Sequence, residues 1–326
     1  MGNPGSVRAG RGRVSLLAVA CGLALVTGAD TLSSHGEFRR PARVPFPADN
    51  PYTVAKAVLG ERLFFDPALS VDRRRSCAGC HDPASNWSDG RPRARGRDGA
   101  DLARRTPPLL DVAWAPRLFR DGRAASLESQ ALVPMEGPNE MGGDRARLVA
   151  RLSADPRYRR AFAAAFPEDP RVCAENIGKA LATFQRGIRS GESAFDRWVA
   201  GDRRALSPEA RRGFTLFTGK AGCVRCHSGW SFSDGAFHDI GLPGADRGRG
   251  AIVKQPALDY AFRTPSLRDV ARNAPYMHDG SLATLDDVLD RHAGPVPYRL
   301  SLSTKLPDVS LAPAERADLL AFLLSL

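Results

Sequence analysis

The sequence predicts a largely helical protein of two domains. Its 326 residues are about twice the ~150 residues of a typical domain. Hydrophobic residues make up 43% and charged residues 25%, which is ordinary for a globular protein and excludes a disordered chain. Several segments have apolar residues at helical spacing, and no two segments show the alternation typical of paired strands. One short cysteine motif occurs twice, so we expect one copy in each domain.

The first 29 residues have the pattern of a secretory signal peptide. Three arginines and no acidic residue precede the uncharged stretch Val14 to Val26, and a predicted cleavage site follows Ala29. The uncharged stretch is shorter than the ~20 residues that span a bilayer, so we expect no stable membrane insertion. Cys21 leaves a lipoprotein as the alternative to a soluble mature chain.

The formal net charge is +11, and removal of the three arginines of the leader reduces it to +8. A basic balance ordinarily suggests nucleic acid or an acidic surface as a partner. An exported bacterial protein rarely meets nucleic acid, so the export signal decides against that partner. We therefore expect a periplasmic protein that binds no nucleic acid.

Two cysteine pairs are each followed directly by a histidine, in Cys77-Ala78-Gly79-Cys80-His81 and in Cys223-Val224-Arg225-Cys226-His227. This CxxCH pattern attaches c-type haem through two thioethers, and the histidine ligates the iron. A zinc ribbon needs pairs about 15–20 residues apart, whereas these lie far apart in the chain, and disulfides would not explain the histidines. We therefore expect two covalently bound c-type haems. The remaining Cys173 is interpreted as a buried free thiol.

Helical patterns precede both motifs and close the chain. They cover Val54 to Phe65, Asn176 to Ile188, a segment with Ser207 as N-cap and Pro208 in the first position, and a segment from near Pro313 to the end. Phe214 and Phe217 share one face of the third segment.

The expected linker between the two haem units consists of Gly191-Glu192-Ser193 and Asp202-Arg203-Arg204. These boundaries give an N-terminal domain of residues 37–190 and a C-terminal domain of residues 191–326. An arginine-rich stretch in the first domain is either a solvated loop or a partner of haem propionates, and contains Arg91, Arg93, Arg95, Arg97, Arg104 and Arg105.

Further motifs accompany the two CxxCH sites. They include Leu63-Phe64-Phe65-Asp66, Asp121-Gly122-Arg123-Ala124, Phe195-Asp196, Pro275-Tyr276-Met277-His278-Asp279-Gly280 and Thr284-Leu285. With this set in this order, the chain resembles the bacterial di-haem cytochrome c peroxidases and the related MauG proteins. The resemblance covers most of the mature chain. It implies an all-α periplasmic enzyme with two cytochrome-c-like haem domains, in which the N-terminal haem reacts with hydrogen peroxide and the C-terminal haem transfers electrons.

The resemblance implies catalytic roles for Glu140 and Gln130. A peroxidase needs an open position at the iron and a group that moves a proton between the two peroxide oxygens. The family's distal glutamate lies ten residues after its distal glutamine, and Gln130 and Glu140 have this spacing. From composition alone, Glu140 after Pro138-Asn139 would be a surface turn residue.

Two departures from the family pattern concern the first haem. Classical members carry a removable histidine ligand sixteen residues after the first haem histidine, and this chain has Arg97 there. We therefore expect a first haem that is five-coordinate or water-bound without prior activation. The family tryptophan between the haems is replaced by Arg120, which leaves Trp114 as a candidate for hole transfer.

Calcium binding stays open. The family's inter-haem calcium asparagine aligns with Arg105, while Asn273 and Pro275 fall where backbone carbonyls would ligate the ion.

Three residues compete as the distal ligand of the second haem, namely Met277, His278 and His292. In the family this ligand lies fourteen residues after the histidine of the Pro-Tyr-x-His motif, and His292 stands at that distance from His278. The resemblance therefore favours a bis-His second haem. His278 is interpreted as a supporting residue, His238 as structural, and His35 has no evident role.

The motifs leave two classes of function, an enzyme that consumes peroxide and a di-haem electron carrier. A carrier would need a distal ligand at the first haem, and the absence of a nearby histidine favours the enzyme. A second imidazole stabilises ferric iron, which favours a MauG-like enzyme that delivers oxidising equivalents to a protein substrate, like the methanobactin-associated MauG-like enzymes. The alternative is a peroxidase that takes electrons from a small cytochrome c or copper protein.

Overall fold

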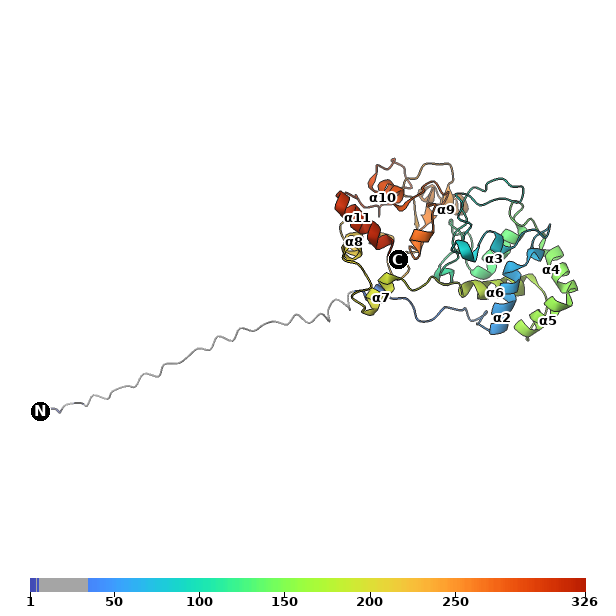
Figure 1. The fold of residues 1–326 in the computed structure, drawn as a ribbon, viewed down its shortest axis with the longest axis horizontal. Helices are drawn as coiled ribbons and strands as arrows, with labels where there is room; N and C mark the ends of the chain where they lie inside the picture. Colours follow the sequence, from blue (N-terminus) through green and yellow to red (C-terminus); the bar gives the residue numbers. More distant parts are fainter. Residues whose placement is uncertain (4, 6–34) are drawn as a thin grey trace.

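The computed structural model describes residues 1–3, 5 and 35–326. Cys21 and nearly all of the predicted signal peptide therefore lie outside the described residues. The described chain is mostly helical, as predicted (Figure 1). Its longer helices are α2 (Val54–Phe65), α3 (Leu127–Glu136), α4 (Arg145–Ala154), α5 (Pro156–Ala165), α6 (Ala174–Arg186), α7 (Ala194–Ala200), α8 (Pro208–Thr218), α9 (Gly248–Val253), α10 (Leu285–Ala293) and α11 (Pro313–Leu323).

One short antiparallel pair of strands corrects the expectation that no strands pair. Strand β1 (Phe237–His238) pairs with β2 (Phe262–Arg263), with Phe237 opposite Arg263. Two residues per strand are too few to produce a visible alternation of apolar and polar residues, so the sequence pattern could not reveal them.

The helix before the first CxxCH segment matches the predicted bounds. Thr53 caps α2 by accepting a hydrogen bond from the Lys56 backbone N–H at 3.2 Å. The helix then packs against α6, and Gly60 makes the close approach possible. A Cβ at Gly60 would lie 2.0 Å from the carbonyl oxygen of Ala180, so a larger residue would push α2 and α6 apart.

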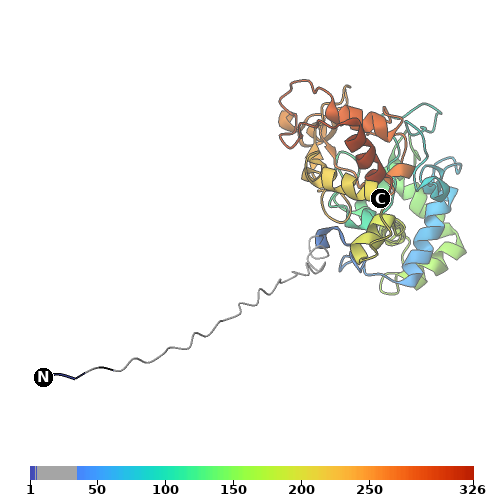
Figure 2. The same ribbon diagram turned by 60° about the vertical axis from the view of Figure 1, so that its left-hand side comes forward.

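The helix before the second CxxCH segment also has a capped start and a glycine where it contacts another helix closely. Ser207 caps α8, as predicted, and a Cβ at Gly213 would lie 2.0 Å from the carbonyl oxygen of Asp318 on α11. Figures 1 and 2 both show α8 and α11 side by side. Phe214 and Phe217 are buried between them together with Phe322, as their shared face predicts.

The core has two main clusters of buried hydrophobic side chains. The first is formed by residues between Leu59 and Ile188, and the second by residues between Phe195 and Leu326. Phe38 is an exception to this division, because it precedes the first cluster in the chain but stacks on Phe232 of the second at 5.2 Å. The beginning of the segment 35–326 is therefore packed against the C-terminal half.

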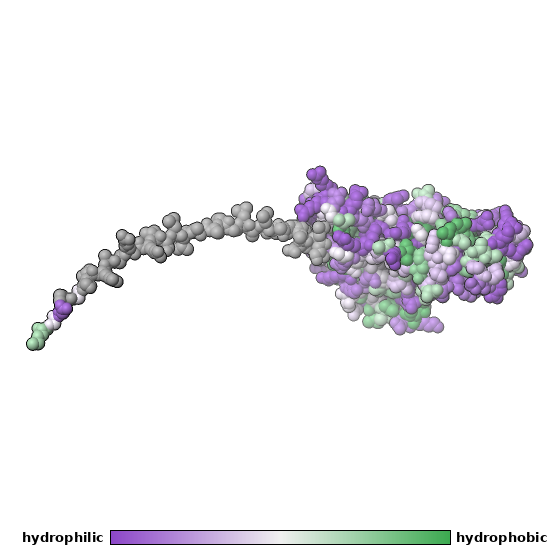
Figure 3. Space-filling model, turned by 90° about the horizontal axis from the view of Figure 1, so that it is seen from below, coloured by the Kyte–Doolittle hydropathy of each residue, from purple (hydrophilic) through white to green (hydrophobic). Residues whose placement is uncertain are grey.

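The surface seen in Figure 3 is mostly hydrophilic, with hydrophobic residues in small separate groups. No helix among the described residues is long and apolar enough to cross a membrane.

Candidate functional site

The two CxxCH segments adopt the same local structure. Each forms a short 3-10 turn, Cys77–Gly79 in the first and Cys223–Arg225 in the second. The backbone N–H of the histidine that follows donates to the carbonyl oxygen of the first cysteine at 2.9 Å in both segments. This turn places both thiols and the imidazole of each segment together.

Each of these histidines is oriented by a backbone carbonyl. The Nδ1–H of His81 donates to the Trp87 oxygen at 3.1 Å, and that of His227 donates to the Phe232 oxygen at 2.9 Å. Burial lowers the pKa of both imidazoles, so both are neutral at pH 7. A neutral imidazole whose Nδ1 carries the proton presents a free Nε2, which is the arrangement of a metal-ligating histidine.

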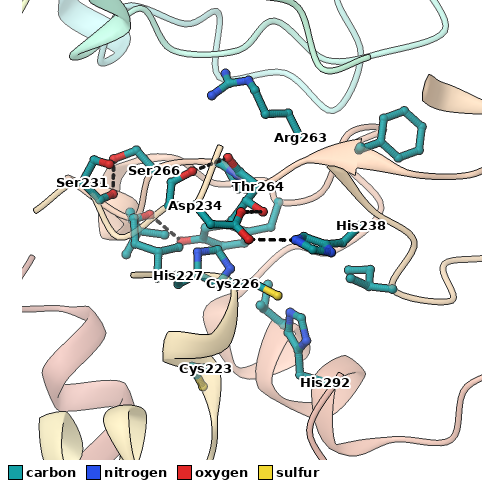
Figure 4. Close-up of a pocket in the computed structure, with 18 of the residues that line it drawn as sticks. Cys223, Cys226, His227, Ser231, Asp234, His238, Arg263, Thr264, Ser266 and His292 are labelled. Carbon is teal, nitrogen blue, oxygen red and sulfur yellow. Dashed lines mark hydrogen bonds and ion pairs between the residues drawn. The ribbon is translucent and has the colours of Figure 1, made fainter. Parts of the chain in front are cut away.

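Each segment opens on a large cavity. The first cavity, defined by Cys77, Cys80 and His81, has a volume of about 910 Å³. The second cavity, defined by Cys223, Cys226 and His227, has a volume of about 640 Å³. Both volumes lie in the range of sites for large organic ligands. Figure 4 shows the second cavity, with Cys226, His227 and His292 around it.

The donor groups fit covalent haem better than a metal ion alone. Burial raises the pKa of the Cys77 thiol to about 12 and that of Cys223 to about 11, as for thiols in apolar surroundings. Among the described residues, neither CxxCH segment brings its two thiols and its imidazole close enough together to hold one metal ion. The five described cysteines are all free, which also excludes disulfides among them. The predicted free thiol of Cys173 is thus confirmed, but its side chain is partly exposed rather than buried, because it precedes α6 at the protein surface.

The first cavity brings Gln130 and Glu140 together with His81. Gln130 extends from α3, and Glu140 lies in the turn after it, where its backbone N–H donates to the Gly137 oxygen at 2.9 Å. Burial raises the pKa of Glu140, and the nearby positive charge of Arg123 opposes this shift. A buried carboxyl group with a raised pKa can in principle exchange a proton, so this arrangement permits acid-base chemistry at the first cavity.

Arg97, which stands where a histidine ligand was considered, is exposed and does not line the first cavity. Its backbone N–H donates to the Asn139 oxygen at 2.7 Å, and its Nε donates to the Pro138 oxygen at 3.3 Å. The side chain therefore braces the outside of the Glu140 turn. Of the arginine-rich stretch, Arg93, Arg95, Arg104 and Arg105 line the cavity, while Arg91 also lies outside it.

The second cavity is lined by His292 of α10 and by Met277. Burial, with smaller contributions from the positive charges of His227 and Arg291, lowers the pKa of His292 to about 4. His227 and His292 line the same cavity. His238 hydrogen-bonds Asp234 and Ser303, each at 2.9 Å, which agrees with a structural role. His35 lies away from both cavities and packs its ring against Trp198 and Phe214.

The two cavities meet at a junction that contains His278. Its ring stacks on Phe262 with centroids 3.8 Å apart, and its Nδ1 is buried without a hydrogen-bond partner. The same junction contains Arg105, Arg120 and Arg263, whose Nε atoms are also buried without partners. Sequence reasoning missed Phe262 and Arg263, which no motif marks.

Trp114 lines the second cavity and packs edge-on against Trp230 with centroids 4.9 Å apart. Trp230 was also missed, although its position just after the second CxxCH segment was a usable signal.

The expected calcium position, at the backbone carbonyls of Asn273 and Pro275, stays a prediction. The Oδ1 of buried Asn273 accepts a hydrogen bond from Asn86 at 2.6 Å, and the guanidinium of Arg105 lies in the same region. Among the described residues, the only cluster of three His, Cys, Asp or Glu side chains within reach of one metal ion is Cys226, Asp234 and His238.

Comparisons with known proteins all find members of one family. Residues 54–204 match the family described as di-haem cytochrome c peroxidase. The methylamine utilization protein MauG of Methylorubrum extorquens is 48% identical over 297 residues, which cover 90% of this chain and 84% of that protein. Cytochrome-c peroxidase IdrP1 of Denitromonas iodatirespirans is 38% identical, with coverage of 86% and 83%. The crystal structure of a MauG-like protein associated with microbial copper homeostasis is similar with a TM-score of 0.79 at 35% identity, with coverage of 88% and 94%.

Proposed function

Because the chain belongs to the family of di-haem cytochrome c peroxidases and MauG proteins, and is therefore an oxidoreductase of that family, we propose that it is a MauG-like periplasmic enzyme. It reduces hydrogen peroxide at the first cavity and draws the electrons, through the second cavity, from side chains of a protein substrate. Reduction of one peroxide to two waters takes two electrons and two protons. When bound, the two haems supply the redox chemistry, and the chain supplies the remaining groups.

The difference between the two cavities carries this proposal. The second contains two buried imidazoles, His227 and His292, which can ligate one iron from both sides. In the described lining of the first cavity, the only histidine besides His81 is His278, which is stacked on Phe262 at the junction. The first cavity instead contains the carboxyl group of Glu140. One cavity is therefore built for substrate and the other for electron transfer.

Glu140 and Gln130 have separate roles in the first cavity. A raised pKa makes the carboxylate of Glu140 a better proton acceptor than an ordinary glutamate. Glu140 accepts a proton from one peroxide oxygen and delivers it to the other. Gln130 has an amide that can hydrogen-bond peroxide and orient it. Arg123 is held by Asp121 at 2.7 Å, and its positive charge favours the ionised carboxylate that accepts the proton.

The relatives favour a protein substrate over a small electron donor. The relatives named MauG are 48% and 46% identical to this chain, whereas those named cytochrome-c peroxidase reach 38%. A bis-imidazole site agrees with this choice, because a second strong donor stabilises oxidised iron and makes it a poor acceptor for a high-potential cytochrome. Reduction of peroxide with electrons from a small cytochrome c or copper protein remains the alternative.

We also propose one haem domain for residues 37–190 and one for residues 191–326. Each then contains one CxxCH segment and one of the two main core clusters, except that Phe38 packs in the second cluster. Residues of both domains line each cavity. The signal-like N-terminus supports export to the periplasm. We leave calcium out of the proposal, because Arg105 stands where the family's calcium asparagine is expected and the side chain of Asn273 is engaged by Asn86.

The proposal is tested by spectroscopy of the purified protein with peroxide. We expect two covalent haems, one with a high-spin and one with a low-spin bis-imidazole ferric EPR signal. The double variant Cys77→Ser/Cys80→Ser should lose the peroxide-reactive haem only, and His292→Ala should change the low-spin signal only. His238→Ala is the matched control, because His238 lines the same cavity but hydrogen-bonds Asp234 and Ser303.

Turnover distinguishes the two kinds of enzyme. With peroxide alone, a MauG-like enzyme should retain two oxidising equivalents for a long time, and it should oxidise reduced cytochrome c slowly. Fast turnover of cytochrome c without such retention would replace the proposal with an ordinary di-haem peroxidase. A single haem in the wild-type protein would refute both.

A further inference from the structure

The junction between the two cavities has more positive charge than its protein neighbours neutralise. Arg105, Arg120 and Arg263 line both cavities. Each has a buried Nε without a hydrogen-bond partner, and none forms an ion pair with a carboxylate among the described residues. An unpaired buried charge costs several kcal/mol, so its persistence indicates a missing anionic partner.

The neighbouring Arg104 shows what a satisfied arginine looks like in this fold. Its Nη1 lies 2.5 Å from Asp121 and its Nε lies 2.7 Å from Asp246, so two carboxylates neutralise it. Arg105, next in the chain, is only 5% exposed and has no such partner, its Nη2 contacting Ser88 at 3.5 Å. Arg291 and Arg299 also have a buried Nε without a partner, but the terminal nitrogens of Arg291 donate to backbone carbonyls and Arg299 pairs with Asp239. Among the described residues, Arg105, Arg120 and Arg263 have neither kind of partner.

The three arginines come from separate segments that the fold holds together. The backbone N–H of Arg263 on β2 donates to the Arg120 oxygen at 2.8 Å, which joins the two halves of the chain. The backbone N–H of Arg105 donates to the His278 oxygen at 3.0 Å. Figure 4 shows Arg263 pointing away from His227 toward the ribbon of the N-terminal half. Burial and the charges of Arg105 and Arg263 lower the pKa of Arg120 to about 9, as expected for like charges without a counterion.

We propose that Arg105, Arg120 and Arg263 form one cationic junction that binds the propionate carboxylates of both haems and raises the reduction potential of both. The inference rests on the proposed function only in assuming one haem in each cavity. Guanidinium groups bind carboxylates through paired, charge-assisted hydrogen bonds, and propionates are the anionic groups that a c-type haem brings. A positive charge in a buried region favours the reduced, less positive iron, and a charge shared by both cavities acts on both irons.

The test is spectroelectrochemistry of the di-haem protein with Arg120→Met, which keeps a long side chain but removes its charge. We expect the equilibrium constant for one-electron reduction of each haem to fall about tenfold, which is about 59 mV for each. Arg120→Lys, which retains the charge, should restore most of this shift. Arg263→Met should lower both potentials as well, which keeps the test informative if one variant folds poorly. Arg212→Met, an exposed arginine on α8 paired with Asp318, is the control and should change neither potential.

Each outcome decides the matter. A shift confined to one haem, or no shift at all, would overturn the shared junction. Potentials of the wild type that depend on added inorganic phosphate would show that the arginines hold a free anion instead. Haem content is measured in the same samples, because two haems with unshifted potentials would refute only the junction, whereas a wild type without two haems would refute the proposed function.

Discussion

Replacing Glu140 by glutamine removes the titrating carboxylate of the first cavity and keeps the shape of the side chain. Among the described residues, no hydrogen bond depends on that carboxylate, and the 2.9 Å bond from this residue to Gly137 uses the backbone N–H. General acid-base groups contribute about 10²–10⁴-fold to a reaction rate. We therefore expect the reaction with peroxide to slow by about 10²-fold or more, which corresponds to about 2.7 kcal/mol of barrier.

Stability should not fall in this variant. Burial raises the pKa of Glu140 above its unfolded value, so the group contributes stability at low pH, and this contribution is lost as pH rises through the folded pKa. At neutral pH the ionised carboxylate therefore costs folding free energy, which glutamine does not. Thermal unfolding of Glu140→Gln should occur at the wild-type temperature or slightly above it.

The assay is stopped-flow absorbance of the haem bands after mixing with peroxide, across a range of pH. The wild-type rate should fall as pH decreases through the raised pKa of Glu140, above the ~4.3 of an ordinary glutamate, because the protonated carboxyl cannot accept a proton. Glu140→Gln should lack this step. Glu136→Gln is the matched control, since Glu136 pairs with Arg145 on the surface and does not line the cavity. If Glu140→Gln reacts with peroxide at the wild-type rate, Glu140 is not the acid-base group and is only a residue of the turn.

Three further predictions concern the rest of the chain. Gly213→Ala should destabilise the fold by about 1–3 kcal/mol in chemical denaturation, because its Cβ would lie 2.0 Å from a backbone oxygen of α11, whereas Gly191→Ala, with nothing within 4 Å, should leave stability unchanged. The pKa of Asp234 is about 2, since hydrogen bonds from His238 and other neighbours outweigh the opposing effect of burial. The wild type should therefore lose stability as pH falls from about 4 toward 2, and Asp234→Asn should show a smaller loss in acid unfolding. Cys173→Ser should keep two haems in a haem assay, because Cys173 lines neither cavity; loss of one would contradict this placement.

Local signals in the sequence accounted for the parts of the site that are contiguous in the chain. A CxxCH segment carries both thiols and the imidazole within five residues, so its chemistry can be interpreted without knowledge of the fold. The bounds of α2 and the capped start of α8 were likewise predictable, because a helix cap and its apolar face involve residues only three or four positions apart. The roles of Gln130, Glu140 and His292 were expected from the resemblance to the family, because no local pattern around these residues indicates a cavity.

Contacts between distant segments were decided only by the tertiary structure. Trp114 meets Trp230, and Arg120 meets Arg263, across the boundary between the two halves of the chain. The strands β1 and β2 are held as a pair by the same packing, although neither has a strand pattern of its own. Such contacts depend on how α2 and α6, and α8 and α11, cross and set the intervening loops. Hydrophobic periodicity specifies which face of a helix is buried but not which distant side chain it will meet, and so the junction between the cavities exists only in the folded chain.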